Sequence, residues 1–368
     1  MITMRRSRWY GVSAVVATAA LVLTGCSDGS GSGGGGETDG EAGGEAEGDM
    51  TGTRACVILP DAASSPRWEN MDRPALEEGL AAAGFDSDVQ NAQGDTNMYA
   101  TIADQQLTQG CGVMLLVDYN GAALAVTEKA QAQGIPVIAY DRPIEGADYY
   151  VSFDNVEVGR LEGQAIVQGL EDAGVDPAEA TVVYMGGDPA DGNAAMFHEG
   201  ADEVMSAAGI TPAAEPPGVW DGEESATNFE QALTSLGGEV DAVWVANDTN
   251  AAGVITVLDK QGLTVPVSGQ DASVAGLQNV LLGKQTATVY KQVTLQAEAA
   301  VDTAVALLEG EEPQADQQLD DGTPYIAVTP VLVGPEEVAT VIDNGDADAA
   351  EVCQGEVAEK CDEQGIEY

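Results

Sequence analysis

Residues 113–140 read VMLLVDYNGAALAVTEKAQAQGIPVIAY and contain two short apolar stretches on either side of an amphipathic one. The apolar stretches Val113–Val117 and Pro136–Tyr140 predict buried strands, whereas Ala122–Gln133 has the apolar spacing of a helix. A strand, a helix and a second strand in this order form a βαβ unit with parallel strands. The stretch therefore predicts an α/β protein whose parallel sheet is covered by helices on both faces.

The same alternation extends through most of the chain and predicts two lobes of similar size. Further strands are expected at Ala55–Leu59, Phe85–Asn91, Thr181–Met185, Val243–Ala246 and Val265–Ser268. Further helices are expected at Pro74–Ala83, Asn97–Gln109, Asn155–Asp172, Ala190–Ala208, Glu224–Leu236 and Asn250–Gln261. Each lobe is thus expected to be a doubly wound parallel sheet, and the crossovers Tyr149–Asp154, Thr288–Lys291 and Tyr325–Val333 are expected to form a hinge.

The chain before the first lobe has the features of an exported lipoprotein. Arg5 and Arg6 precede the apolar run Val12–Leu23, which is too short for a stable membrane span and is typical of a signal peptide. The run leads into Leu23-Thr24-Gly25-Cys26, which resembles a bacterial lipobox with Cys26 as the acylated residue. An ordinary cleaved signal with a chance cysteine is the alternative. Residues after Cys26 are rich in Gly, Ser and Glu and predict a disordered tether.

These patterns divide the chain into five expected segments. They are a signal peptide (1–25), a tether (26–53), an N-terminal lobe (54–153 plus 291–324), a C-terminal lobe (154–290 plus 325–342) and a tail (343–368). The tail is acidic and is expected to be solvated. Its aspartates lack the glycine and glutamate spacing of an EF-hand, so no calcium or other metal site is expected there.

The formal net charge of −49 limits the possible partners of the protein. A surface this acidic repels phosphate backbones, so nucleic acid is not expected to bind. Only 13 Lys and Arg residues are present, and a cation at a predicted strand end is therefore conspicuous.

The five cysteines predict one lipid attachment and two disulfides. Apart from Cys26, an even number remains, as expected in an oxidising compartment. Cys56 opens the first strand and Cys111 precedes the third, and these strands are neighbours in a sheet of order 2-1-3. We therefore expect a Cys56–Cys111 disulfide and a second, local pair formed by Cys353 and Cys361.

Polar and aromatic side chains follow the predicted strands and indicate a binding cleft between the lobes. Asp and Asn accept hydrogen bonds from sugar hydroxyls, Arg and Lys donate to them, and Trp offers a flat platform for a sugar ring. Helix capping, core packing or simple solvation could instead explain each position separately. The candidate residues are Arg67, Trp68, Asp141, Arg142, Asp191, Asn193, Trp220, Asn247, Asp271 and Lys291.

These positions lie in stretches that resemble the sugar-binding proteins of bacterial ABC importers, above all the D-xylose-binding group. The matching stretches include Ala139-Tyr140-Asp141-Arg142, Met185-Gly186-Gly187-Asp188, Trp220-Asp221-Gly222, Ala246-Asn247-Asp248, Ser268-Gly269-Gln270-Asp271 and Thr288-Val289-Tyr290-Lys291. The resemblance covers roughly residues 54–341. It implies that the candidate residues contact a monosaccharide, with D-xylose preferred, and that Lys291 lies at the hinge.

The same resemblance implies a monomeric, extracytoplasmic protein that delivers its sugar to ABC permease subunits and needs no cofactor. Binders of glucose, galactose and arabinose share much of this pattern. The tether, the paired cysteines and the tail are not accounted for by the resemblance.

Other classes of protein fit the sequence less well. The single histidine, His198, lies within a predicted helix, and no P-loop or metal-ligand motif is present, so an enzyme is not expected. Sugar-responsive repressors share the two-lobed fold but need a DNA-binding headpiece where this chain has a signal peptide. A receptor that presents its ligand to a membrane sensor is an open alternative to the transport subunit.

The lipobox predicts that Cys26 is the acylated first residue of the mature protein. Mass spectrometry of the protein isolated from its native membrane should find a lipid-modified N-terminal peptide starting at this residue. A free thiol at Cys26, or a mature start elsewhere, would show the prediction to be wrong.

Overall fold

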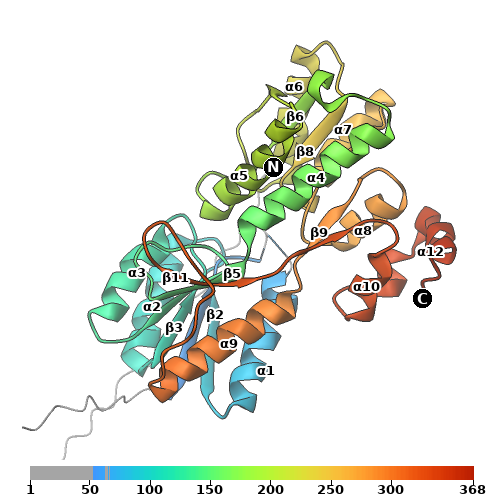
Figure 1. The fold of residues 1–368 in the computed structure, drawn as a ribbon. Coiled ribbons are helices and arrows are strands. Elements are labelled where there is room, and N and C mark those ends of the chain that lie inside the picture. The colour runs from blue at the N-terminus through green and yellow to red at the C-terminus, as the bar shows by residue number, and fades with distance from the viewer. Residues whose placement is uncertain (1–52, 63–64, 66) are drawn as a thin grey trace, which may run out of the picture. The chain divides into compact units, whose positions relative to one another are not determined.

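The computed structural model describes residues 53–62, 65 and 67–368 (Figure 1). The predicted signal peptide, Cys26 and nearly all of the predicted tether lie outside the described residues. Among the described helices, none has the length and apolarity that crossing a bilayer requires.

The first lobe is built on a seven-stranded sheet. Its order is β10-β11-β5-β4-β3-β1-β2, and all pairs are parallel except β10 with β11. The strands are β1 (Arg54–Leu59), β2 (Asp86–Asn91), β3 (Val113–Leu116), β4 (Val137–Tyr140), β5 (Tyr149–Phe153), β10 (Gln317–Gln318) and β11 (Pro324–Val328). The predicted order 2-1-3 of the first three strands is confirmed.

Helices cover both faces of this sheet, as the βαβ pattern predicted. One face packs against α2 (Thr96–Gln109) and α3 (Ala122–Gln131), and the other against α1 (Arg73–Ala82) and α9 (Val293–Glu309). A π-helical turn, η1 (Trp68–Asp72), leads directly into α1. Helix α9 was not predicted from the sequence.

The second lobe has a smaller parallel sheet of order β7-β6-β8. Its strands are β6 (Val182–Met185), β7 (Pro212–Ala214) and β8 (Ala242–Val245). One face packs against α4 and α5, and the other against α6 and α7. The bounds of these helices are Asn155–Asp172 for α4, Gly192–Ala207 for α5, Gly222–Ser235 for α6 and Asp248–Gln261 for α7; a short 3-10 turn, η2 (Pro177–Glu179), follows α4.

The predicted strand Val265–Ser268 was wrong as a regular strand. Only an isolated bridge joins Val267 to Val243, and the hydroxyl of Ser268 bonds to both the backbone nitrogen and oxygen of Val245, at 2.7 and 3.2 Å. A side chain thus replaces part of the backbone ladder. Pro266 also lacks an N–H to contribute.

Three chain segments connect the lobes. They follow β5, β9 (Thr288–Tyr290) and β11, and β9 pairs antiparallel with β12 (Val331–Val333) beside the second lobe. Strand β11 pairs with β5, so residues 325–328 belong to the first sheet. The predicted transfer of the chain to the C-terminal lobe at residue 325 is therefore too early, because the crossing follows Val328.

The acidic tail is folded, which corrects the expectation of a solvated segment. It forms α11 (Ala349–Val352), η3 (Gly355–Val357) and α12 (Ala358–Gln364), and it follows α10 (Val338–Asp343), which ends at the first residue of the tail. Its apolar side chains form one buried cluster with α8 (Val274–Leu281), which was also not predicted. The acidic side chains mask this apolar pattern in the sequence.

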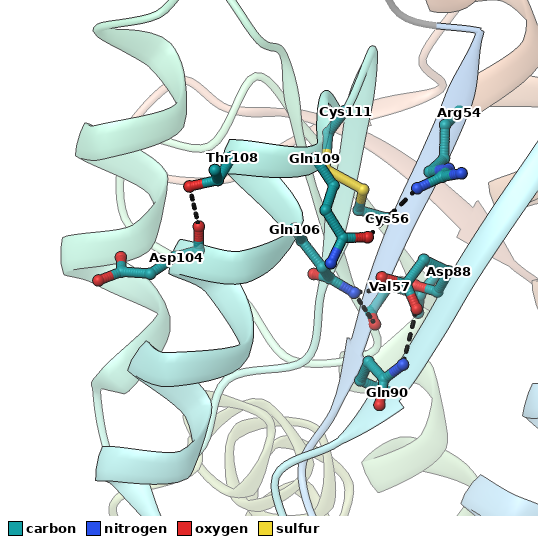
Figure 2. Close-up of a disulfide and its surroundings, with 10 residues drawn as sticks. All are labelled: Arg54, Cys56, Val57, Asp88, Gln90, Asp104, Gln106, Thr108, Gln109 and Cys111. Atoms are coloured by element: carbon teal, nitrogen blue, oxygen red, sulfur yellow. Dashed lines mark hydrogen bonds between the residues drawn. A yellow bond between two sulfur atoms is a disulfide. The ribbon is translucent and has the colours of Figure 1, made fainter. Parts of the chain in front are cut away.

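Both predicted disulfides are confirmed. Cys56 on β1 pairs with Cys111, just before β3, with 5.8 Å between the Cα atoms (Figure 2). Beside it, Gln106 of α2 donates to the backbone oxygens of Val57 and Asp88, at 3.2 and 2.9 Å, and so joins α2 to β1 and β2. Cys353 pairs with Cys361 within the tail, at 5.9 Å.

The two disulfides close loops of different length, and this predicts different effects on stability. The bonded residues are 55 positions apart in the first lobe and 8 apart in the tail. Loop-closure entropy predicts that Cys56→Ala/Cys111→Ala lowers the free energy of unfolding by about 4 kcal/mol and Cys353→Ala/Cys361→Ala by about 2.5 kcal/mol. Urea unfolding of the two double variants measures this; equal losses, or the reverse order, would contradict it.

Candidate functional site

All the candidate residues predicted from the sequence line one pocket between the lobes. The structure adds Ser65, Phe197 and Gln270 to this lining. The pocket is narrow, with a volume of about 50 Å³, and it opens on one side into a vestibule of about 750 Å³. Arg142, Asp191 and Trp220 line both spaces and mark the constriction between them.

Arg67 lines the pocket from the first lobe. Its guanidinium donates to both carboxylate oxygens of Asp72, to Asp141 and to Gln296, over 2.7–2.9 Å. Burial alone would lower the pKa of Arg67, but Asp72 and Asp141 outweigh that effect and raise it well above its ordinary value. Arg67 is therefore permanently charged. Its orientation is fixed by hydrogen-bond partners on η1, at the end of β4 and on α9.

Asp141 is held in a left-handed backbone conformation, with φ of 66°. Its backbone oxygen accepts hydrogen bonds from Tyr150, Ser152 and Asn193, at 2.8–2.9 Å, and these contacts stabilise the strained turn after β4. Burial raises the pKa of the Asp141 carboxyl, but the neighbouring cations, Arg67 first, reverse the shift and lower it. The side chain is therefore a carboxylate that accepts hydrogen bonds.

Arg142 and Asp191 form an ion pair across the cleft, with 3.2 Å between Nε and Oδ2. Asp191 also caps α5 by accepting a hydrogen bond from the backbone nitrogen of Asn193. The alternative of helix capping is therefore correct for Asp191, in addition to its ion pair. Asn193 then bridges the lobes, since its amide nitrogen donates to the backbone oxygen of Asp141. Capping and cleft contact are thus combined in this loop.

The second lobe presents Asp271 and Asn247 to the pocket. Asp271 pairs with Lys291, with 2.9 Å between Oδ1 and Nζ, and has φ of 96°. Its turn is held to β9 by a backbone bond from Asp271 to Val289. Asn247 caps α7, because its side chain accepts a hydrogen bond from the backbone nitrogen of Asn250. Helix α8 is capped by Ser273 and not by Asp271.

Trp220 is fixed at the edge of the pocket by close packing. A Cβ atom on Gly187 would lie 2.1 Å from the Trp220 ring, so only glycine allows this approach. The ring of Phe197 meets Trp220 edge to face, with 6.4 Å between centroids. In the first lobe, the guanidinium of Arg67 lies 4.6 Å from the centroid of the Trp68 ring.

Two buried polar atoms at the pocket lack a hydrogen-bond partner within the part of the chain that the structure describes. They are Oε1 of Gln270 and Nε1 of Trp220. Gln270 is 2% exposed, and its amide nitrogen donates to the backbone oxygen of Ala246. Buried polar groups are nearly always satisfied, so this acceptor and this donor each require a partner, which a water molecule or a ligand can supply. Gln270 lies in a strand-end stretch noted in the sequence, whereas nothing in the sequence signalled Phe197.

The charged side chains that line the pocket balance one another. Each of three cations has its own carboxylate partner: Arg67 with Asp141, Arg142 with Asp191 and Lys291 with Asp271. A lining without net charge suits a neutral polar ligand, because no charge needs neutralisation when water leaves. The described residues include no group of three or more His, Cys, Asp or Glu side chains arranged to hold a metal ion.

Two α/β lobes with a polar pocket between them and three connecting segments define the architecture of a two-lobed ligand-binding protein. Residues 56–312 match the model of the periplasmic binding protein domain. The chain belongs to this periplasmic binding protein family.

Individual relatives agree with this assignment. The chain is 36% identical over 293 residues to the D-xylose-binding periplasmic protein of Escherichia coli strain K12. This match covers 76% of this chain and 86% of that protein. The chain is 29% identical over 319 residues to the multiple sugar-binding periplasmic receptor ChvE of Rhizobium radiobacter, with 78% and 89% covered. A solved ABC transporter solute-binding protein from Clostridium phytofermentans with bound β-D-glucose has a TM-score of 0.73 and 27% identity, and the match covers 81% of this chain and 99% of that one.

Asp248 holds the loop that carries Asp271. It is fully buried and accepts hydrogen bonds from the Ser273 backbone nitrogen, Gln285 and Thr288, at 2.8–2.9 Å. Burial raises the pKa of Asp248 to about 7, although the bond from Gln285 opposes the shift. The folded protein therefore keeps this proton to higher pH than the unfolded chain does.

This difference predicts a pH dependence of stability. Between about pH 4 and 7 the folded state binds the Asp248 proton and the unfolded state releases it, so this group lowers the free energy of unfolding as the pH rises. Asp248→Asn should remove this contribution, so its free energy of unfolding should fall less, or rise more, with increasing pH than that of wild type. Urea unfolding at pH 4.5, 5.5, 6.5 and 7.5 measures both proteins, and parallel profiles would contradict the prediction.

Proposed function

We propose that this protein is the extracytoplasmic solute-binding subunit of an ABC importer, and that it binds a monosaccharide, D-xylose in the first place. The observation that carries the proposal is the chemistry of the pocket lining. Its cations and carboxylates form pairs, and one buried acceptor and one buried donor have no hydrogen-bond partner among the described residues. A sugar hydroxyl both donates and accepts, so it satisfies Gln270 Oε1 and Trp220 Nε1 with the same kind of group.

The choice of D-xylose rests on two supports. The first is the 36% identity to the Escherichia coli D-xylose-binding protein. The second is that every residue carried over from that resemblance lies at the same pocket. Glucose, galactose and arabinose are the alternative ligands that the sequence resemblance left open, and the β-D-glucose bound to one solved relative supports the first of them.

Binding proceeds, in this proposal, by closure of the lobes around the sugar. The first lobe supplies Arg67, Trp68, Asp141 and Arg142, and the second supplies Asp191, Asn193, Trp220, Asn247 and Asp271, with Lys291 at the hinge. Closure removes water from the polar contacts and strengthens them. The closed, monomeric protein then docks on the permease, while acylation at Cys26 keeps it at the outer face of the cell membrane.

A ligand-presenting receptor for a membrane sensor is the second candidate, and it is favoured by the similarity to the ChvE receptor. Both roles use the same sugar-bound state. Loss of sugar uptake after deletion of the gene supports the transport role, whereas normal uptake with a lost transcriptional or chemotactic response supports the receptor.

The ion pairs of the pocket predict that Arg142 and Asp271 are needed for affinity but not for folding. Removing either side chain leaves sugar hydroxyls and the former partner unpaired in a dehydrated site, which costs about 1–3 kcal/mol for each neutral group. Arg142→Ala and Asp271→Ala should each weaken binding at least about tenfold. Asp271→Asn is added because asparagine tolerates a left-handed backbone better than alanine does.

Calorimetric titration with D-xylose, D-glucose, D-galactose and L-arabinose measures these effects, and D-xylose should bind the wild type most tightly. Arg160→Ala and Asp259→Ala, which break exposed ion pairs away from the pocket, are the matched controls and should bind like wild type. If the wild type binds none of the four sugars, the sugar proposal fails. If the folded pocket variants bind normally, the assigned residues are wrong.

A further inference from the structure

A second cavity adjoins the sugar pocket on the side away from the acidic vestibule. This chamber has a volume of about 640 Å³ and shares Ser65, Arg67, Asp271 and Lys291 with the pocket. The vestibule shares none of these four residues. The pocket therefore borders a second space on each of two sides.

The chamber and the vestibule differ in chemistry. The vestibule lining includes Asp61, Asp118, Asp188, Asp191, Asp221 and Glu224, and Arg142 is its one cation among the described residues. The chamber is lined in large part by apolar side chains, including Met71, Val274, Ala275, Val293 and Val341. In the vestibule, an uncharged apolar group would displace water from carboxylates, which costs free energy. In the chamber, the same group would bury apolar surface, which is favourable.

The folded tail supplies one wall of the chamber. Asp346 and Glu351 of the tail belong to this wall together with Val341 of α10, just before the tail, and all three follow the segment that matches the family model. Asp346 accepts a hydrogen bond from the hydroxyl of Tyr290, the residue before Lys291.

The wall is fixed in place from α8 and within the tail itself. Gln278 of α8 donates to the backbone oxygens of Glu351 and Val352, at 3.0 and 3.1 Å. The Cys353–Cys361 disulfide follows immediately. The tail thus has a defined position at the site, which the resemblance to known sugar binders did not explain.

We propose that the protein also binds glycosides of its sugar, with the sugar ring in the pocket and a neutral, apolar aglycone in the chamber. This inference rests on the proposed sugar-binding function. A cavity of this volume falls within the range of small-molecule pockets, which are mostly apolar with a few polar groups. Asp346 and Glu351 line the chamber, so anionic aglycones are disfavoured.

The test compares the free sugar with its methyl and phenyl glycosides, as both anomers, by calorimetry on the full chain. One phenyl anomer should bind at least as tightly as the matching methyl glycoside. Ala275→Trp fills the chamber from an exposed position on α8, and should weaken phenyl glycoside binding at least about tenfold while changing the affinity for the free sugar by less than about twofold.

Ala190→Trp is the matched control, because Ala190 is an exposed alanine that lines the vestibule. It should leave the phenyl glycoside affinity unchanged. If the free sugar binds and neither phenyl anomer does, the inference is overturned while the proposed function stands. It is also overturned if Ala190→Trp, and not Ala275→Trp, weakens phenyl glycoside binding. If no sugar binds at all, the proposed function itself has failed.

Discussion

The pocket depends on the burial of one guanidinium group. Arg67 is 8% exposed, and a charge removed from water in this way must be surrounded by partners. Its partners come from η1, the end of β4 and α9, and Tyr140 completes the network by donating to Asp72 at 2.6 Å. Segments more than 200 positions apart in the chain are thus held together at the pocket before any ligand arrives. The hydrogen bonds that satisfy the buried Arg67 guanidinium therefore also hold the side chains of the pocket in place before a ligand binds.

The sequence predicted the parts of the fold that follow from local pattern. Buried strands of branched residues, such as Val113–Leu116, predicted the first sheet, and the order 2-1-3 was sufficient to predict the Cys56–Cys111 disulfide. The site residues were predictable because parallel strands end at one edge of the sheet, so Asp141 and Arg142 lie there whatever the details of the helices.

Features that depend on tertiary packing were not predictable in this way. Phe197 lies inside α5, and its place at the pocket follows from the packing of α5 against α4 and Trp220. In the tail, the buried residues Val357 and Cys361 are four positions apart, but acidic neighbours mask the apolar stripe. The Ser268 hydroxyl that replaces part of a strand ladder has no signature in sequence at all.

The contact between Gly187 and Trp220 has a stereochemical consequence. Because the indole of Trp220 packs directly against the backbone of Gly187, the ring cannot shift in that direction to make room for a ligand on its other side. A pyranose with only equatorial hydroxyls offers such a surface a flat face of C–H groups, whereas an axial hydroxyl projects from that face and holds the ring away. A rigid platform of this kind would sort sugars by the geometry of their hydroxyls, without any hydrogen bond to the hydroxyl that causes rejection.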